Sequence, residues 1–172
     1  MASRAGVFFL GIIVGIIALI AGAILFIRGG GISMATSASP LPFEENLAGM
    51  AIRASIGDAA KQKNPLAANE SNLIAGAHVF EEHCSACHGI LGQARTETAK
   101  GMFPPPPQLL TAEGGVTDDP EGVTYWVVTH GIRLSGMPAF SGALSDTERW
   151  QVTALVAHAD KLPPDVSAVL SR

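Results

Sequence analysis

The amino-acid sequence predicts an all-α protein in which one long apolar helix precedes several short helices. Three observations support this class. Residues 5–27 form an uncharged apolar run of helical length. Further along, apolar side chains recur at spacings of three and four residues. Helix-capping residues stand at the start of several of these stretches.

Composition excludes several classes of protein. The chain has 172 residues, of which 48% are hydrophobic and only 15% are charged, whereas about a quarter is usual for soluble domains. This hydrophobic content excludes an intrinsically disordered chain. A formal net charge of −4 argues against a nucleic-acid partner. Two cysteines are too few for a disulfide-rich scaffold.

The run over residues 5–27 is flanked by Arg4 and Arg28. About 20 apolar residues suffice to cross a lipid bilayer as a helix, so we expect an uncleaved, single-pass membrane anchor. A cleaved signal peptide is the alternative. Its apolar core would be shorter, and the small residues over 37–39 would have to serve as the cleavage site.

Small residues also share one face of this predicted anchor. They follow at spacings of four, three and four: Gly11, Gly15, Ala18 and Gly22. Such a face permits close contact with a partner helix in the membrane. The alternative is that these residues merely reflect the ordinary abundance of glycine in membrane spans.

Residues 28–70 are expected to be a linker that includes a short amphipathic helix over residues 43–56. The predicted helix has two glutamates in its first turn, where negative charge is favourable. Its apolar stripe consists of Phe43, Leu47, Met50 and Ala54. We expect this stripe to pack on the domain that follows; the membrane surface and a partner protein are the alternatives.

Both cysteines lie in the motif Cys84-Ser85-Ala86-Cys87-His88, which is the pattern for covalent attachment of a c-type haem. The two thiols project from one helical turn and can bond the two vinyl groups of one porphyrin, with His88 as the proximal iron ligand. A zinc site would need further ligands close by. A thioredoxin-like redox pair would need a preceding strand, which the sequence does not predict.

Upstream of this motif, Gly76, Phe80 and Cys84 follow one another at spacings of four on a predicted helix capped by Ser71. With the motif, this spacing resembles the small single-haem cytochrome c family with a His/Met iron. The resemblance implies a helical domain around one covalent haem over residues 71–163, with a C-terminal tail over 164–172. In the family, the glycine lets the first helix of the domain cross the last closely.

The last helix of that family often carries an aromatic residue against this glycine, and the nearest match here is Leu155. The helix itself is predicted by the capping box Ser145-Asp146-Thr147-Glu148 and by a following apolar stripe. Another helix is expected to start at residues 118–121 and to stop at Gly131. The absence of an aromatic residue at this place leaves open which residue packs on Gly76, and it does not change the predicted fold.

The candidates for the sixth iron ligand are Met102, His130, Met137 and His158. Met137 stands between a glycine and a proline, which disfavour a helix and leave a loop. The family places its axial methionine in such a loop, so Met137 is our prediction. The resemblance also implies that a carbonyl of the run over 104–107, four consecutive prolines, accepts the second ring N–H of His88.

The resemblance implies a one-electron carrier rather than an enzyme, because an iron with both axial positions filled has no open site. The resemblance also implies haem attachment outside the cytoplasmic membrane, so we expect the N-terminus in the cytoplasm and the haem domain in the periplasm, anchored to the inner membrane. The expected partners are respiratory or photosynthetic complexes or other cytochromes. The alternatives are a fixed haem c subunit of a membrane oxidoreductase or oxidase complex, and a haem peroxidase or ligand sensor with an open iron site.

Overall fold

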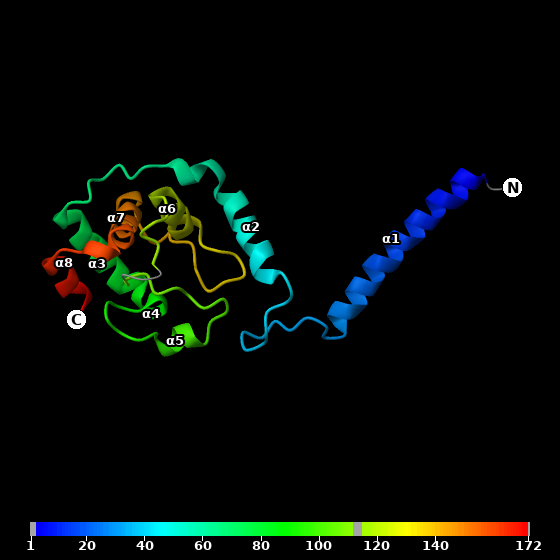
Figure 1. Cartoon of the computed structure of the whole chain (residues 1–172), viewed down its shortest axis with the longest axis horizontal. Coiled ribbons are helices and arrows are strands. Elements are labelled where there is room, and N and C mark those ends of the chain that lie inside the picture. Colours follow the sequence, from blue (N-terminus) through cyan, green and yellow to red (C-terminus); the bar gives the residue numbers. More distant parts are fainter. Residues whose placement is uncertain (1–2, 112–114, 172) are drawn as a thin grey trace. The chain divides into compact units, whose positions relative to one another are not determined.

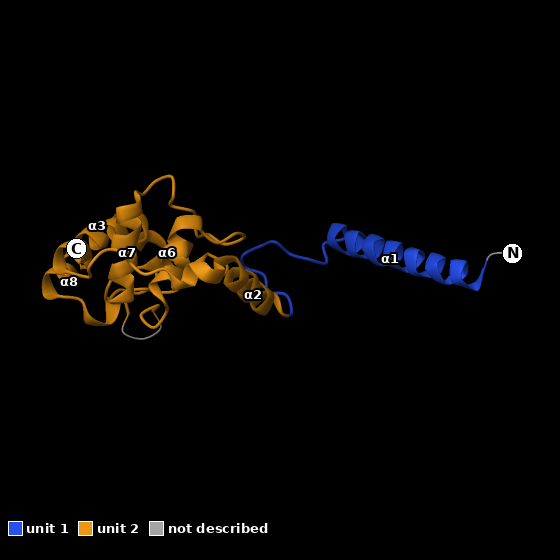
Figure 2. Ribbon diagram, turned by 90° about the horizontal axis from the view of Figure 1, so that it is seen from above, with its two compact units in different colours: residues 1–42 blue, residues 43–172 orange. Residues whose placement is uncertain are grey.

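The computed structural model describes residues 3–111 and 115–171, and these residues form helices and loops without a strand. The chain divides into two compact units, residues 1–42 and residues 43–172 (Figure 2). The predicted all-α class is confirmed.

The first unit contains α1 (Arg4–Arg28), which includes the whole uncharged run (Figure 1). The hydroxyl of Ser3 accepts a hydrogen bond from the Gly6 backbone N–H at 3.1 Å and begins the helix. The side chains of α1 are exposed along its length. By length and composition α1 can cross a membrane, a test that an N-terminal signal sequence also passes.

The second unit begins with α2 (Glu44–Ile56) and the short 3-10 helix η1 (Gly57–Lys61). The helix lies where the sequence predicts it, but the expected packing face is wrong. The stripe that includes Leu47 and Met50 is exposed to solvent, by 59% and 53% at these two positions. The inward face carries Ile52 and the buried Ile56, because this pair, four residues apart, faces the rest of the unit.

Helices α3 (Glu70–His83) and α7 (Asp146–Ala157) cross at the centre of the second unit. A Cβ atom added at Gly76 would lie 2.3 Å from the Gln151 carbonyl oxygen and 3.2 Å from the Leu155 Cβ. The glycine therefore permits the close crossing, and Leu155 is its neighbour on α7. Around this crossing both helices bury large apolar side chains: Leu73, Phe80, Val152, Leu155 and Val156.

Helix α3 begins earlier than the sequence analysis expects. The side-chain oxygen of Asn69 accepts a hydrogen bond from the Asn72 backbone N–H at 3.0 Å. Asn69 is therefore the N-cap in place of Ser71, which lies within the first turn. The side chain of Asn69 reaches the backbone N–H groups that a helix leaves without partners at its start.

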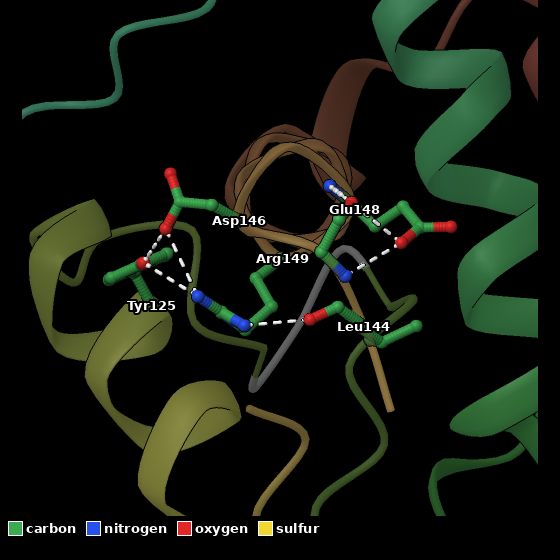
Figure 3. Close-up of polar contacts among 6 residues, drawn as sticks. Tyr125, Leu144, Asp146, Glu148 and Arg149 are labelled. Carbon is green, nitrogen blue, oxygen red and sulfur yellow. Dashed lines mark hydrogen bonds and ion pairs between the residues drawn. The ribbon is translucent and has the colours of Figure 1, made fainter. Parts of the chain in front are cut away.

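Helix α6 (Glu121–His130) packs against α7 and against η1. The rings of Tyr125 and Trp150 stack at 3.8 Å between centroids. The Tyr125 hydroxyl donates to Asp146, and Arg149 donates to Asp146 at 3.1 Å and to the Leu144 carbonyl at 2.7 Å (Figure 3). These contacts fix the N-terminal end of α7 relative to α6.

The predicted capping box at the start of α7 is present. The Ser145 hydroxyl accepts from the Glu148 backbone N–H at 3.3 Å, and the Glu148 carboxylate accepts from the Ser145 backbone N–H at 2.7 Å. Hydrogen bonding to Ser145 lowers the pKa of Glu148 below its ordinary value. The box therefore stabilises α7 with its carboxylate ionised.

The residues expected as a C-terminal tail contain α8 (Pro164–Leu170), which packs on α3. Val166, Val169 and Leu170 are buried there. The sequence did not predict α8 because its seven residues are too few to show a clear amphipathic pattern. Its burial against α3 stabilises it instead.

Candidate cofactor-binding site

The cysteine pair and the following histidine occupy one helical turn at the end of α3. The chain bends at Cys84 and continues as α4 (Ser85–His88). The backbone N–H groups of Cys87 and His88 donate to the Cys84 carbonyl at 3.1 and 2.9 Å. Gly89, with φ of +74°, ends the turn in a conformation that glycine adopts without strain. The turn thus holds the three side chains of the motif in a fixed arrangement.

The His88 ring is oriented by the proline-rich segment. Its Nδ1–H donates to the Pro107 carbonyl oxygen at 2.8 Å. Four prolines leave carbonyls without local partners, and the structure brings that of Pro107 to the histidine. Burial lowers the pKa of His88, although the hydrogen bond to Pro107 acts against this shift. The ring is thereby favoured in its neutral form, with Nε2 as the nitrogen left for a metal.

Met137 lies in a loop that folds back on the end of α6. The backbone N–H groups of Phe140 and Ser141 donate to the last carbonyls of α6 at 3.0 and 3.3 Å. A Cβ at Gly131 would lie 2.7 Å from the Met137 carbonyl oxygen, so the loop approaches the helix end closely. Within the loop, the Met137 N–H donates to the Ser135 hydroxyl at 3.1 Å. The loop is therefore closed on itself and attached to α6.

A cavity of about 320 Å³ lies between these segments, within the usual range of about 300–1,000 Å³ for small-molecule and cofactor sites. All four predicted site residues line it: Cys84, Cys87, His88 and Met137. The proline run closes part of it. The remaining walls are mainly apolar side chains of α3, α6 and α7: Phe80, Val123, Val127, Val128, Val152 and Val156.

The other candidates for the sixth ligand divide into two groups. Met102 lines the same cavity as Met137. His130 instead contacts the Trp126 ring at 4.8 Å between centroids. His158 donates from Nδ1 to the Ala154 carbonyl at 2.9 Å. Neither histidine belongs to the described lining of the cavity, so both are poor candidates for a ligand there.

The two alternative interpretations of the cysteine pair are not supported over residues 3–111 and 115–171. These residues bring no three His, Cys, Asp or Glu side chains together as a metal site would require. They also contain no strand on which a thioredoxin-like pair could follow. Burial raises the pKa of Cys84 to about 12, with a further contribution from Cys87. Without a bound group, Cys84 is therefore held in its neutral thiol form.

Residues 71–156 match the protein family described as cytochrome c oxidase, cbb3-type, subunit III. The match covers half of the chain and contains the whole attachment turn and the Met137 loop. The chain belongs to this cytochrome c family. A cytochrome c domain implies covalent haem c and electron transfer, and the presence of only two cysteines in the sequence fits one haem.

Among solved structures, a chain of the reducing HAO-like protein complex of Kuenenia stuttgartiensis is similar. It shares 25% sequence identity at a TM-score of 0.48, over 69% of the present chain and 61% of that chain. The similarity therefore covers less than two thirds of that chain. No curated protein matches the sequence significantly.

The residues of the cavity fit a haem c. Two cysteines on one turn, a histidine oriented through its Nδ1, and a thioether in the lining of the same apolar cavity supply the chemical groups that such a haem needs. Metal-ligating histidines commonly donate the N–H of their other ring nitrogen to an acceptor, as His88 does to the Pro107 carbonyl. When bound, haem c supplies a one-electron ferric–ferrous couple.

Sequence reasoning missed one wall of the cavity. Ile52 of α2 lies in the lining, although α2 precedes the matched region. Its segment is held close by a second tight approach, because a Cβ at Gly122 would lie 2.4 Å from the Ala59 carbonyl oxygen in η1. The only local signal was the spacing of four between Ile52 and Ile56.

Proposed function

We propose that this protein is a membrane-tethered one-electron carrier with a single haem c. In this proposal Cys84 and Cys87 form the two thioether bonds, and His88 and Met137 are the axial iron ligands. The observation that carries the proposal is the single apolar cavity that all four side chains line. They come from two segments that are about 50 residues apart, and the fold brings both to one cavity.

Each side chain has a distinct task in this arrangement. The Pro107 carbonyl keeps the His88 ring in one tautomer and one orientation, which prepares Nε2 for iron. The Met137 loop, closed by Ser135, holds a neutral sulfur in the lining of the same cavity. The apolar walls exclude water and disfavour added charge, which tunes the reduction potential.

Redox-titrated optical spectroscopy of the purified full chain tests this assignment. We expect a low-spin haem c with the sulfur-to-iron charge-transfer absorption in the far red. Met137→Ala removes this absorption in the proposal, and Cys84→Ala leaves one thioether, which shifts the absorption of the reduced haem. A Met137→Ala protein with an unchanged low-spin spectrum contradicts the assignment. Carbon monoxide binding by the reduced wild-type protein at neutral pH favours a peroxidase or sensor instead.

The tether is supported by α1, whose uncharged apolar length suffices for a bilayer. We place the haem domain in the periplasm and the N-terminus in the cytoplasm of a bacterial cell, with residues 5–27 as the span. Anchoring raises the effective concentration of the domain for membrane partners. Alkaline extraction of membranes should leave the full chain in the pellet. Release of a shorter, soluble chain indicates signal-peptide cleavage, and protection from protease in spheroplasts contradicts the orientation.

A fixed subunit of an oxidase complex is the second candidate, because the matched family is described as a subunit of cbb3-type cytochrome c oxidase. The small residues of α1 offer a face for close packing in such a complex: Gly11, Gly15, Ala18 and Gly22. Blue-native electrophoresis of mildly solubilised membranes separates the two candidates. Co-migration of the haem with a large complex supports the subunit, whereas migration as a small protein supports the free carrier.

A further inference from the structure

Gly136, directly before Met137, has the side chain of Met102 in the place where a Cβ would stand. A Cβ atom built at Gly136 would lie 1.8 Å from the Met102 methyl carbon and 3.5 Å from its sulfur. The methyl group thus packs directly on the Gly136 backbone. From its sequence alone, Met102 is an alternative candidate for the sixth iron ligand.

Met102 is attached to the part of the fold that contains His88. It follows α5 (Glu97–Lys100), and its backbone N–H donates to the Ala99 carbonyl at 3.4 Å. Ala99 is buried. The Thr96 side chain caps α5 and also donates to the Ala86 carbonyl in α4 at 2.7 Å. Met102 therefore connects the attachment turn to the Met137 loop.

The tip of the Met137 loop projects into solvent at Leu134. Leu134 is 85% exposed and has a φ of +60°, which is uncommon for a residue with a Cβ. The hydrogen bonds described above tie the loop to the end of α6 and close it through Ser135. The contact of Met102 with Gly136 adds support from the side of the cavity.

We propose that Met102 is a positioning residue, which packs its thioether methyl on Gly136 and so holds Met137 in place for the iron. A side chain at position 136 displaces the Met102 methyl, which is the movable end of its side chain. The inference rests on the proposed function, in which Met137 is the axial ligand. Met102 itself stays off the iron and acts through packing, a role that the soft and flexible methionine side chain suits.

Exchange of the axial methionine for added imidazole measures this support. In the ferric full-chain holoprotein, imidazole competes with Met137, and loss of the far-red absorption reports its binding. Met102→Ala should bind imidazole about tenfold more tightly, equivalent to about 1.4 kcal/mol. Met102→Leu restores most of the packing and should stay within about twofold of wild type. Met50→Ala is the matched control, because Met50 is 53% exposed on α2.

The outcomes separate the inference from the function on which it rests. If Met102→Ala binds imidazole as the wild type does while Met137→Ala loses the far-red absorption, the positioning role is wrong and the ligand assignment stands. If Met102→Ala loses that absorption and Met137→Ala keeps it, Met102 is the ligand. In that case both the positioning role of Met102 and the assignment of Met137 as the ligand are wrong. Gly136→Ala, which keeps both methionines, should weaken the sulfur–iron bond in the same direction as Met102→Ala. Unchanged imidazole binding in that variant also contradicts the inference.

Discussion

Gly76→Ala places a methyl group into the crossing of α3 and α7. The new Cβ would lie 2.3 Å from the Gln151 carbonyl oxygen and 2.8 Å from the carbonyl carbon. An ordinary contact begins at 3.4 Å, so the two helices must separate by about 1 Å. The obstacle is backbone, which cannot rotate away as the end of a side chain can.

The magnitude follows from two opposing effects. Alanine gains about 1 kcal/mol over glycine within a helix. Overpacking typically costs about 1–3 kcal/mol, and a rigid backbone obstacle exceeds that range when the core around Phe80 and Leu155 must also shift. We expect a net loss of about 2 kcal/mol in the free energy of unfolding. For a domain of roughly this size, the melting temperature should fall by about 10 °C.

Thermal unfolding of the full-chain holoprotein, followed by circular dichroism, measures this loss. Gly49→Ala in α2 is the matched control, since the nearest atom to its new Cβ is the movable end of Arg53 at 3.3 Å. That variant should be as stable as the wild type or slightly more stable. A Gly76→Ala protein that melts at or above the wild-type temperature refutes the reasoning about the close crossing.

Three further predictions concern other parts of the second unit. Met137→His should lower the reduction potential by on the order of 0.2 V, because a second histidine replaces a sulfur ligand that favours the ferrous state; a potentiometric titration that finds no decrease speaks against this ligand. Tyr125→Phe keeps the ring on Trp150 but removes its hydrogen bonds to Asp146 and Arg149, so urea unfolding should show a loss of about 1–2 kcal/mol. Glu148→Ala should lower the melting temperature at pH 7. Because the folded-state pKa of Glu148 lies below its ordinary value of 4.5, the carboxylate contribution is complete above that value and is lost as the pH falls through the folded pKa. A difference from wild type that stays constant between pH 7 and pH 3 contradicts this.

The local patterns of the sequence predicted the elements that depend on neighbouring residues. The attachment turn forms at Cys84–His88 because its hydrogen bonds join residues three and four apart. The capping box at Ser145 and Glu148 is equally local. The predicted N-cap of α3, Ser71, was wrong, because Asn69 two residues earlier caps the helix.

Contacts between distant segments had no such signal. The carbonyl of Pro107 was one of four equivalent candidates until the fold brought it to His88. The prediction of which face of α2 packs inward was wrong, because two apolar faces compete on that helix. Only packing beside the cavity selects Ile52 and Ile56.

The sequence by itself determined a helical protein with an apolar N-terminal segment, a haem-attachment turn and a methionine loop. Spacing and capping specify these features within a few residues, since hydrogen bonds and side-chain periodicity act over one or two helical turns. Only the tertiary structure decided that Met102 rests on Gly136 and that η1 lies against Gly122. These close contacts depend on how all the other elements pack. A glycine in the sequence shows that space is available but does not identify the group that fills it.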